Sequence, residues 1–284
     1  LHKEYRRQRQ MCIRDRKEYI TSANALMNMM SSIVQLSTWT LGGFLMSLIG
    51  AKYLFLFALV LEILSYFFII QLSERHIYNN EKENILNSFK TVLRHNYFNK
   101  LSLYLNLSTI FESVATSIWV AAIILTYTRT FLHVDDFWFG LINAAFFSGT
   151  IIAGLWINGK DQFFTKISYP VIIYIPLILA FINVSFILHK SVLLALLISL
   201  LMGIFEDSRY ISLNSVVQRE VPKEILTSTY ILNNLLSSVF FSLGTLGISL
   251  VVDNQGVMWA YVISGVAYVL TFILGLYFKI AIKN

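Results

Sequence analysis

The chain has 284 residues, of which 56% are hydrophobic, 15% aromatic and only 13% charged, with a formal net charge of +6. A soluble domain carries roughly a quarter of charged residues, so this composition excludes a water-soluble fold and predicts a polytopic membrane protein. The single cysteine, Cys12, excludes a disulfide framework, and the five histidines lie outside or at the ends of the apolar runs. We therefore expect no cofactor and no metal.

Residues 1 to 17 differ from the rest of the chain. The string RRQRQMCIRDR at 6 to 16 resembles translated adapter sequence, and the chain begins with Leu1. We therefore expect a non-native segment and a truncated reading frame. The alternative is a genuine basic cytoplasmic segment.

Eight apolar stretches follow, each long enough to cross a hydrocarbon core of about 30 Å as a helix. They lie at 21 to 48, 53 to 73, 101 to 128, 136 to 158, 168 to 188, 191 to 213, 225 to 252 and 256 to 280. The sequence therefore predicts an all-α membrane protein with eight transmembrane helices. All joints but one are short, so consecutive helices should be antiparallel neighbours.

The long joint, 74 to 100, carries apolar residues at helical spacing between 85 and 93. We expect an amphipathic helix there, either on the inner leaflet or packed under the bundle. Lysine and arginine are concentrated in alternate connections, with twelve on one side and three on the other when the first segment is left out. The positive-inside rule then places both termini and the 74 to 100 linker in the cytoplasm.

An internal repeat suggests how the helices are organised into domains. The string NMMSSI at 28 to 33 returns as NLLSSV at 234 to 239, and TLG at 40 to 42 returns at 245 to 247. The repeating unit would then be six helices long, as in transporters built from two six-helix halves. On this plan 18 to 73 holds the last two helices of the first half, 74 to 100 is a linker, and 101 to 284 is the complete second half.

Four stretches resemble the major facilitator superfamily, and more narrowly its branch of macrolide-efflux proteins and the enterobactin exporter. They are ANALMNMMSSIVQLSTWTLGGFL at 23 to 45, LEILSY at 61 to 66, FGLINAAFFSG at 139 to 149 and QREVPKE at 218 to 224. The resemblance implies that the chain covers helices five to twelve of a twelve-helix bundle.

The resemblance further implies a monomeric secondary transporter of the bacterial cytoplasmic membrane that exports a small hydrophobic or amphipathic molecule, coupled to protons or another ion. Two departures weaken the comparison. Thr38 and Trp39 stand where efflux members usually carry Gly-Pro, and the gate motif after the eighth helix is reduced to Gly159, Lys160 and Asp161.

Ionisable residues inside the apolar runs are the candidates for coupling or substrate binding. A carboxylate at bilayer depth is costly, so it should face a cavity or a partner. Burial favours the neutral acid and water favours the anion, so such a group can carry a proton. The candidates are Glu112, Glu62, Asp207, Glu206 and Arg209.

Each candidate also has a structural reading. Glu112 could be tied to a neighbouring helix by hydrogen bonds, and Glu62 could serve helix packing. Arg209 could form a local ion pair with Glu206, three residues earlier, or line a cytoplasmic gate together with Asp207.

A pocket for the substrate could be lined by polar and aromatic residues of the same helices. The candidates are Ser113, Thr116, Trp119, Tyr127, Phe146 and Phe147. Other functions stay open: a metabolite or siderophore transporter of the same fold, a non-transporting membrane sensor, or a membrane-embedded enzyme. No basic, aromatic-interleaved face indicates nucleic-acid binding.

Overall fold

The computed structural model describes residues 20–71 and 99–283 of the chain. These residues form helices and short connections, with no strand among them, so the prediction of an all-α fold is confirmed. The first segment and most of the 74 to 100 linker, with its expected amphipathic helix, lie outside the described residues.

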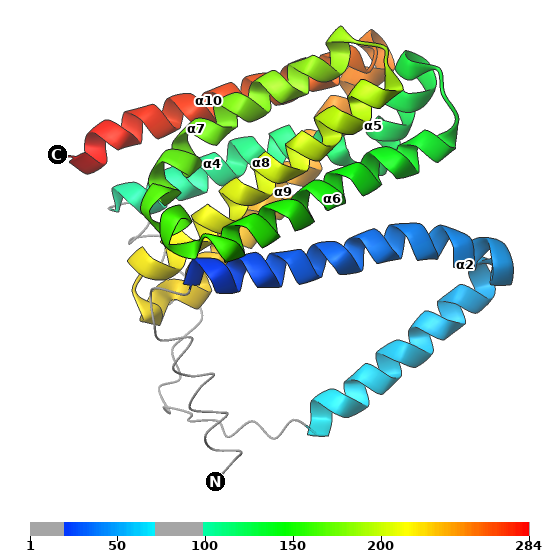
Figure 1. The fold of residues 1–284 in the computed structure, drawn as a ribbon, viewed down its shortest axis with the longest axis horizontal. Helices are drawn as coiled ribbons and strands as arrows, with labels where there is room; N and C mark the ends of the chain where they lie inside the picture. The colour runs from blue at the N-terminus through cyan, green and yellow to red at the C-terminus, as the bar shows by residue number, and fades with distance from the viewer. Residues whose placement is uncertain (1–19, 72–98, 284) are drawn as a thin grey trace.

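Helix α2, Ile20–Gln71, contains two of the expected spans. It breaks at Gly50, whose φ of 76° and ψ of 158° are accessible to glycine but strained for other residues. We call residues 20 to 49 the first arm and 51 to 71 the second arm. Figure 1 shows the first arm running beside α6 and the second arm turning away from the bundle. Every described side chain of the second arm is exposed.

The next span is broken into four pieces. Helix α4, Lys100–Thr116, begins where the Asn99 side chain accepts a hydrogen bond from the Ser102 amide at 3.2 Å. A single turn of 3₁₀-helix, Ser117–Trp119, leads to Val120 in extended conformation, and α5, Ala121–Thr126, passes into a π-helical turn, Tyr127–Leu132. The two main parts of this span meet at 45°.

The remaining helices follow one another through short connections, as their apolar runs predicted. They are α6 (Asp136–Gly159), α7 (Asp161–Leu188), α8 (Val192–Glu220), α9 (Lys223–Gln255) and α10 (Met258–Lys283). Helix α7 continues through Pro170 and Pro176. Figure 1 shows these helices lying side by side in one bundle with α4 and α5.

Helices α6 and α8 approach each other closely because each places a glycine at the contact. A Cβ on Gly149 would collide with the backbone of Leu200, and a Cβ on Gly203 with the backbone of Phe146. Small residues allow this packing in a membrane, where association depends on close contact between helices. The two glycines therefore fix α8 beside α6, and α8 carries the ionisable residues described below.

Buried side chains form clusters along the bundle. One end is filled by aromatic rings that include Tyr127, Phe186 and Tyr261, and the other by a cluster that includes Tyr104, Ile172 and Phe278. Between these ends lies a cluster around Leu179, Met202 and Tyr268. The bundle therefore has a packed core beside the cavity described below.

Four of the described helices are long and apolar enough to cross a membrane. They are Phe137–Gly159, Asp161–Leu188, Ile225–Gln255 and Met258–Lys279, and the bent pair Lys100–Trp119 and Ala122–Leu132 adds a fifth if it counts as one span. Helix α8 falls outside this group and carries Glu206, Asp207 and Arg209 close together. The protein is thus a multi-pass membrane protein.

Candidate functional site

A cavity of about 620 Å³ opens between the first arm of α2 and helices α4, α8 and α9. Its volume lies within the range of small-molecule sites, roughly 300–1,000 Å³. Its wall combines polar side chains with apolar ones, and α6 adds two aromatic side chains, Phe146 and Phe147. The ionisable residues of the described wall are Glu112, Glu206, Asp207 and Arg209.

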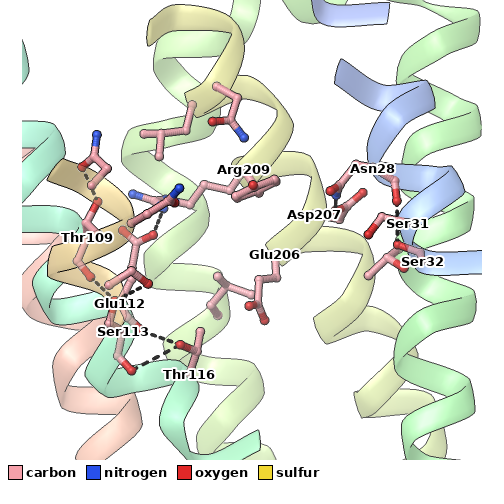
Figure 2. Close-up of a pocket in the computed structure, with 18 of the residues that line it drawn as sticks. Asn28, Ser31, Ser32, Thr109, Glu112, Ser113, Thr116, Glu206, Asp207 and Arg209 are labelled. Atoms are coloured by element: carbon pink, nitrogen blue, oxygen red, sulfur yellow. Dashed lines mark hydrogen bonds and ion pairs between the residues drawn. The ribbon is translucent and has the colours of Figure 1, made fainter. Parts of the chain in front are cut away.

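An ion pair joins α8 to α4 inside this cavity. Arg209 donates through Nη1 to Oε2 of Glu112, and the two side chains are 3% and 19% exposed. Figure 2 shows this contact on the α4 side of the cavity. Oε1 of Glu112 and Nη2 of Arg209 are buried and have no hydrogen-bond partner among the described residues. Each member of the pair thus has one buried polar atom whose hydrogen-bonding capacity is not used by the described residues.

The position of Arg209 is also set by a proline on α7. Pro176 has no backbone N–H, so the Ile172 carbonyl, four residues earlier, loses its helical donor. That carbonyl accepts instead from Arg209 Nε at 3.1 Å and from the Tyr104 hydroxyl at 3.3 Å. The guanidinium is therefore held at two points, one a carboxylate and one a freed carbonyl.

On the other side of α8, Asp207 faces the first arm of α2. The Asn28 side-chain amide donates to Oδ1 of Asp207, while Oδ2 of Asp207 has no partner among the described residues. Glu206 lies between this contact and the ion pair, as Figure 2 shows, and its Oε2 is also unpartnered. The three α8 residues therefore point in three directions around one turn of the helix.

The Asn28 contact belongs to a row of hydrogen bonds with uncharged donors along the first arm. Near the start of the arm, Thr21 and Thr165 share a hydrogen bond of 3.0 Å between their hydroxyls, and Ser22 donates to Asn158. Asn24 then exchanges amide hydrogen bonds with Gln218, with the Gln218 Nε2 to Asn24 Oδ1 distance at 3.1 Å. We call this row the α2 ladder.

The opposite wall is built from α4 and α9 in a similar way. The Thr109 hydroxyl donates to Asn233 Oδ1 at 3.2 Å, and Ser113 and Ser237 share a hydrogen bond of 3.1 Å. The two copies of the internal repeat thus line one cavity, because Asn28 and Ser31 of the first copy and Asn234 and Ser237 of the second all belong to its wall. The repeat places an amide and a hydroxyl at matching positions of two helices.

The structure brings together most of the residues singled out from the sequence. Glu112, Glu206, Asp207 and Arg209 line the cavity, as do Ser113, Thr116, Phe146 and Phe147. The expected local pair between Glu206 and Arg209 is wrong, since Arg209 reaches across to Glu112 and is held there by the Ile172 carbonyl.

Trp119 and Tyr127 do not belong to the cavity wall, because the span breaks at Val120 and turns them into the core. The Trp119 ring packs against Phe146 and Phe186, and Tyr127 donates to the Phe186 carbonyl at 2.8 Å. Trp119 nevertheless supports the wall from behind, since its ring centroid lies 5.1 Å from that of Phe146.

Glu62 and the reduced gate motif lie away from the cavity. Glu62 is exposed on the second arm of α2. Gly159 ends α6, Lys160 connects, and Asp161 begins α7, where its carboxylate accepts from the Thr165 hydroxyl at 3.3 Å. Thr165 also bonds Thr21, so the loop lies where the α2 ladder starts. A gating role for this loop stays a prediction.

Several wall residues were not singled out from the sequence. They are amides and hydroxyls of α2 and α9, including Asn28, Ser31, Gln35, Asn233 and Ser237. Spacings of three or four residues place Asn24, Asn28, Ser31 and Gln35 on one side of an apolar helix. That polar stripe, repeated in α9, was the signal that could have found them.

Interrupted helices beside a cavity with buried ionisable groups, and an internal repeat in its walls, are features of secondary transporters. The chain belongs to the major facilitator superfamily of transporters, because the model of a family described as transmembrane secretion effector matches residues 12–284. The resemblance proposed from the sequence is thereby confirmed at the level of the superfamily.

Two relatives from Bacillus subtilis (strain 168) are similar to the chain over most of its length. The uncharacterized MFS-type transporter YjbB is 22% identical over 266 residues, which are 92% of this chain and 64% of YjbB. The uncharacterized MFS-type transporter YfmI is 25% identical over 263 residues, which are 89% of this chain and 63% of YfmI. The chain spans less than two thirds of the length of either relative.

Proposed function

We propose that the chain forms part of a proton-coupled secondary transporter that exports a small hydrophobic or amphipathic molecule by alternating access. The observation that carries the proposal is the ion pair between Glu112 and Arg209 in the wall of a cavity large enough for such a molecule. A proton taken up by Glu112 would neutralise one partner and weaken the pair. Proton binding and the geometry of the cavity would then depend on each other.

We further propose that the carrier lies in the bacterial cytoplasmic membrane, works as a monomer and has both termini in the cytoplasm. In that orientation the α2 ladder would close the cytoplasmic end of the cavity, because Thr21, Ser22 and Asn24 precede Asn28 along the first arm. The cargo would bind from one side while the ladder is closed and leave when it opens.

A polar metabolite is the second candidate substrate, because the described wall contains amides and hydroxyls from α2, α4 and α9. Such groups would satisfy hydroxyl or amide groups of a polar cargo. A hydrophobic cargo would instead use Phe146, Phe147 and the leucines of the wall. The two candidates differ in which variants should reduce transport.

The test uses the longest open reading frame that contains this chain, reconstituted into vesicles with a pH-sensitive dye inside. A proton gradient should drive substrate movement, and substrate should in turn move protons. Glu112→Gln should abolish proton movement, and Glu62→Gln, outside the cavity, should retain it. Full coupling in the Glu112→Gln variant would refute the assignment of coupling to that residue.

A further inference from the structure

The charges in the cavity do not balance. Arg209 and Glu112 cancel one another in their ion pair, and no other lysine, arginine or histidine occurs in the described wall. Among the described residues, Glu206 and Asp207 are left without a cation of their own in the cavity wall. Two such groups are costly as carboxylates in a membrane cavity, so each either takes up a proton or is joined by a positive charge.

We propose that Glu206 and Asp207 recognise the charged group of a cationic amphiphile, such as an organic ammonium or phosphonium ion. The inference rests on the proposed function, because it names the class of substrate that the same cavity takes. It concerns what the cavity binds and is independent of which residue couples transport to protons.

The free acceptor atoms of the two residues indicate where the cation would bind. Asp207 is 5% exposed; its Oδ1 accepts from Asn28, but its Oδ2 has no partner among the described residues. Oε2 of Glu206 is likewise buried and unpartnered. Both residues belong to the cavity wall, so rotation of either side chain would turn its unpartnered oxygen toward a ligand in the cavity.

Helix geometry explains why Glu206, rather than Arg209, lies nearest to the middle of the cavity. Residues on a helix are about 100° apart, so Asp207 points about 100° to one side of Glu206 and Arg209 about 60° to the other. Asp207 meets α2 and Arg209 meets α4, which leaves Glu206 between the two walls (Figure 2). A ligand in the cavity would therefore meet Glu206 before the other two.

The apolar part of the ligand would lie against α6. Phe146 and Phe147 belong to the same wall, and the Phe146 ring is supported by Trp119 at a centroid distance of 5.1 Å. Aromatic faces attract organic cations as well as apolar groups. The combination of two carboxylates and two phenyl rings therefore suits an amphiphile with a delocalised or substituted positive charge.

A bare metal ion and an anion fit the cavity less well. No group of three histidine, cysteine, aspartate or glutamate residues that could hold a metal occurs in the part of the chain that the structure describes. An anion would have to use Arg209, which is already engaged by Glu112 and the Ile172 carbonyl, and would lie next to two carboxylates. A bare metal ion would therefore find too few protein ligands, and an anion would leave Glu206 and Asp207 without a positive charge.

The experiment compares two probes of similar shape: tetraphenylphosphonium, a permanent cation, and triphenylphosphine oxide, which is neutral. Their dissociation constants are measured by equilibrium dialysis at pH 7 with the purified protein that contains this chain. Wild type should bind the cation more tightly. Glu206→Gln and Asp207→Asn should each weaken cation binding about tenfold or more, as expected for the loss of a charged contact. Binding of the neutral probe should change by less than about twofold.

Two controls separate loss of charge from loss of fold. Glu206→Asp keeps the charge and should retain most of the affinity for the cation, and Glu62→Gln should behave as wild type. Gel filtration of every variant checks that the protein is intact. Unchanged cation binding in the Glu206→Gln, Asp207→Asn double variant, or equal wild-type affinity for both probes, would overturn the proposal.

The two proposals fail in different ways. If wild type moves the neutral probe with protons but does not bind the cation, the cationic class is wrong and the transport function stands. If the cation binds through Glu206 but no proton gradient moves it, recognition stands and proton-coupled export falls.

Discussion

The two faces of α8 make contacts of different kinds. Toward α4, Arg209 forms an ion pair with Glu112 and is held by the Ile172 carbonyl. Toward the first arm of α2, the contacts use uncharged donors, as when Asn28 donates to Asp207 and Asn24 to Ser215 at 3.1 Å. The charged contact joins two helices of the main bundle, and the other contacts join that bundle to the first arm of α2.

The difference indicates which surface can separate during transport. Breaking a buried ion pair costs several kcal/mol, because it leaves a charge without a partner. A hydrogen bond between side chains within a membrane is worth about 0.6 kcal/mol on average, and the partners can rebind water when they separate. We infer that the α2 ladder opens during transport, and that the α4 face of α8 separates less, because its ion pair weakens only when Glu112 takes up a proton.

The largest effect should come from breaking the charged face. Arg209→Gln leaves Glu112 without its cation, and we expect a loss of about 3 kcal/mol in stability. Thermal unfolding in detergent, followed by gel filtration, measures it. The double variant Glu112→Gln, Arg209→Gln removes both charges and should recover most of the lost stability. A double variant as unstable as Arg209→Gln would show that the pair is not what holds this face.

A second test addresses the close contact between α6 and α8, which fixes the position of α8 in the bundle. Gly203→Ala places a methyl group against the backbone of Phe146, and we expect a loss of about 1–3 kcal/mol from the forced separation of α6 and α8. Gly140→Ala is the matched control, because no atom lies within 4 Å of a Cβ at that position. Equal melting temperatures for the two variants would contradict the close approach of these helices.

The smallest effect should come from the other face. Asn28→Ala removes one contact of the α2 ladder, and we expect a loss of about 1 kcal/mol or less. The variant should instead alter the rate of transport, because the ladder is the surface that opens. Measurement of both stability and transport rate sharpens the comparison of the two faces. A stability loss as large as that of Arg209→Gln would remove the distinction between them.

The helices themselves could be predicted because their signals are local. The apolar runs matched spans of the observed helices, and the break at Gly50 fell in the predicted joint of α2. The break at Val120 was not predictable in this way, since no glycine or proline marks it. Trp119 and Tyr127 were therefore expected in the cavity, although the turn of the chain directs them into the core.

Four of the five ionisable candidates lie in the cavity wall and Glu62 does not, and the partner of Arg209 was not predicted. Local spacing favours Glu206 as the partner of Arg209, and only the rotation of α8 against α4 shows that Glu112 is nearer. Such rotations depend on packing contacts such as Gly149 and Gly203, which are spread over the whole bundle. The sequence thus indicates which residues are costly to bury, whereas the fold decides which of them meet.

Pro176 has an effect beyond the bend of its own helix. It is absent from the described cavity wall, yet the oxygen that it leaves without a helical donor is one of the two acceptors that hold Arg209. A residue with a backbone N–H at this position would compete for that oxygen and allow the guanidinium to shift. A relative with another residue at position 176 should therefore differ in ligand preference, although the side chain at this position does not contact the ligand.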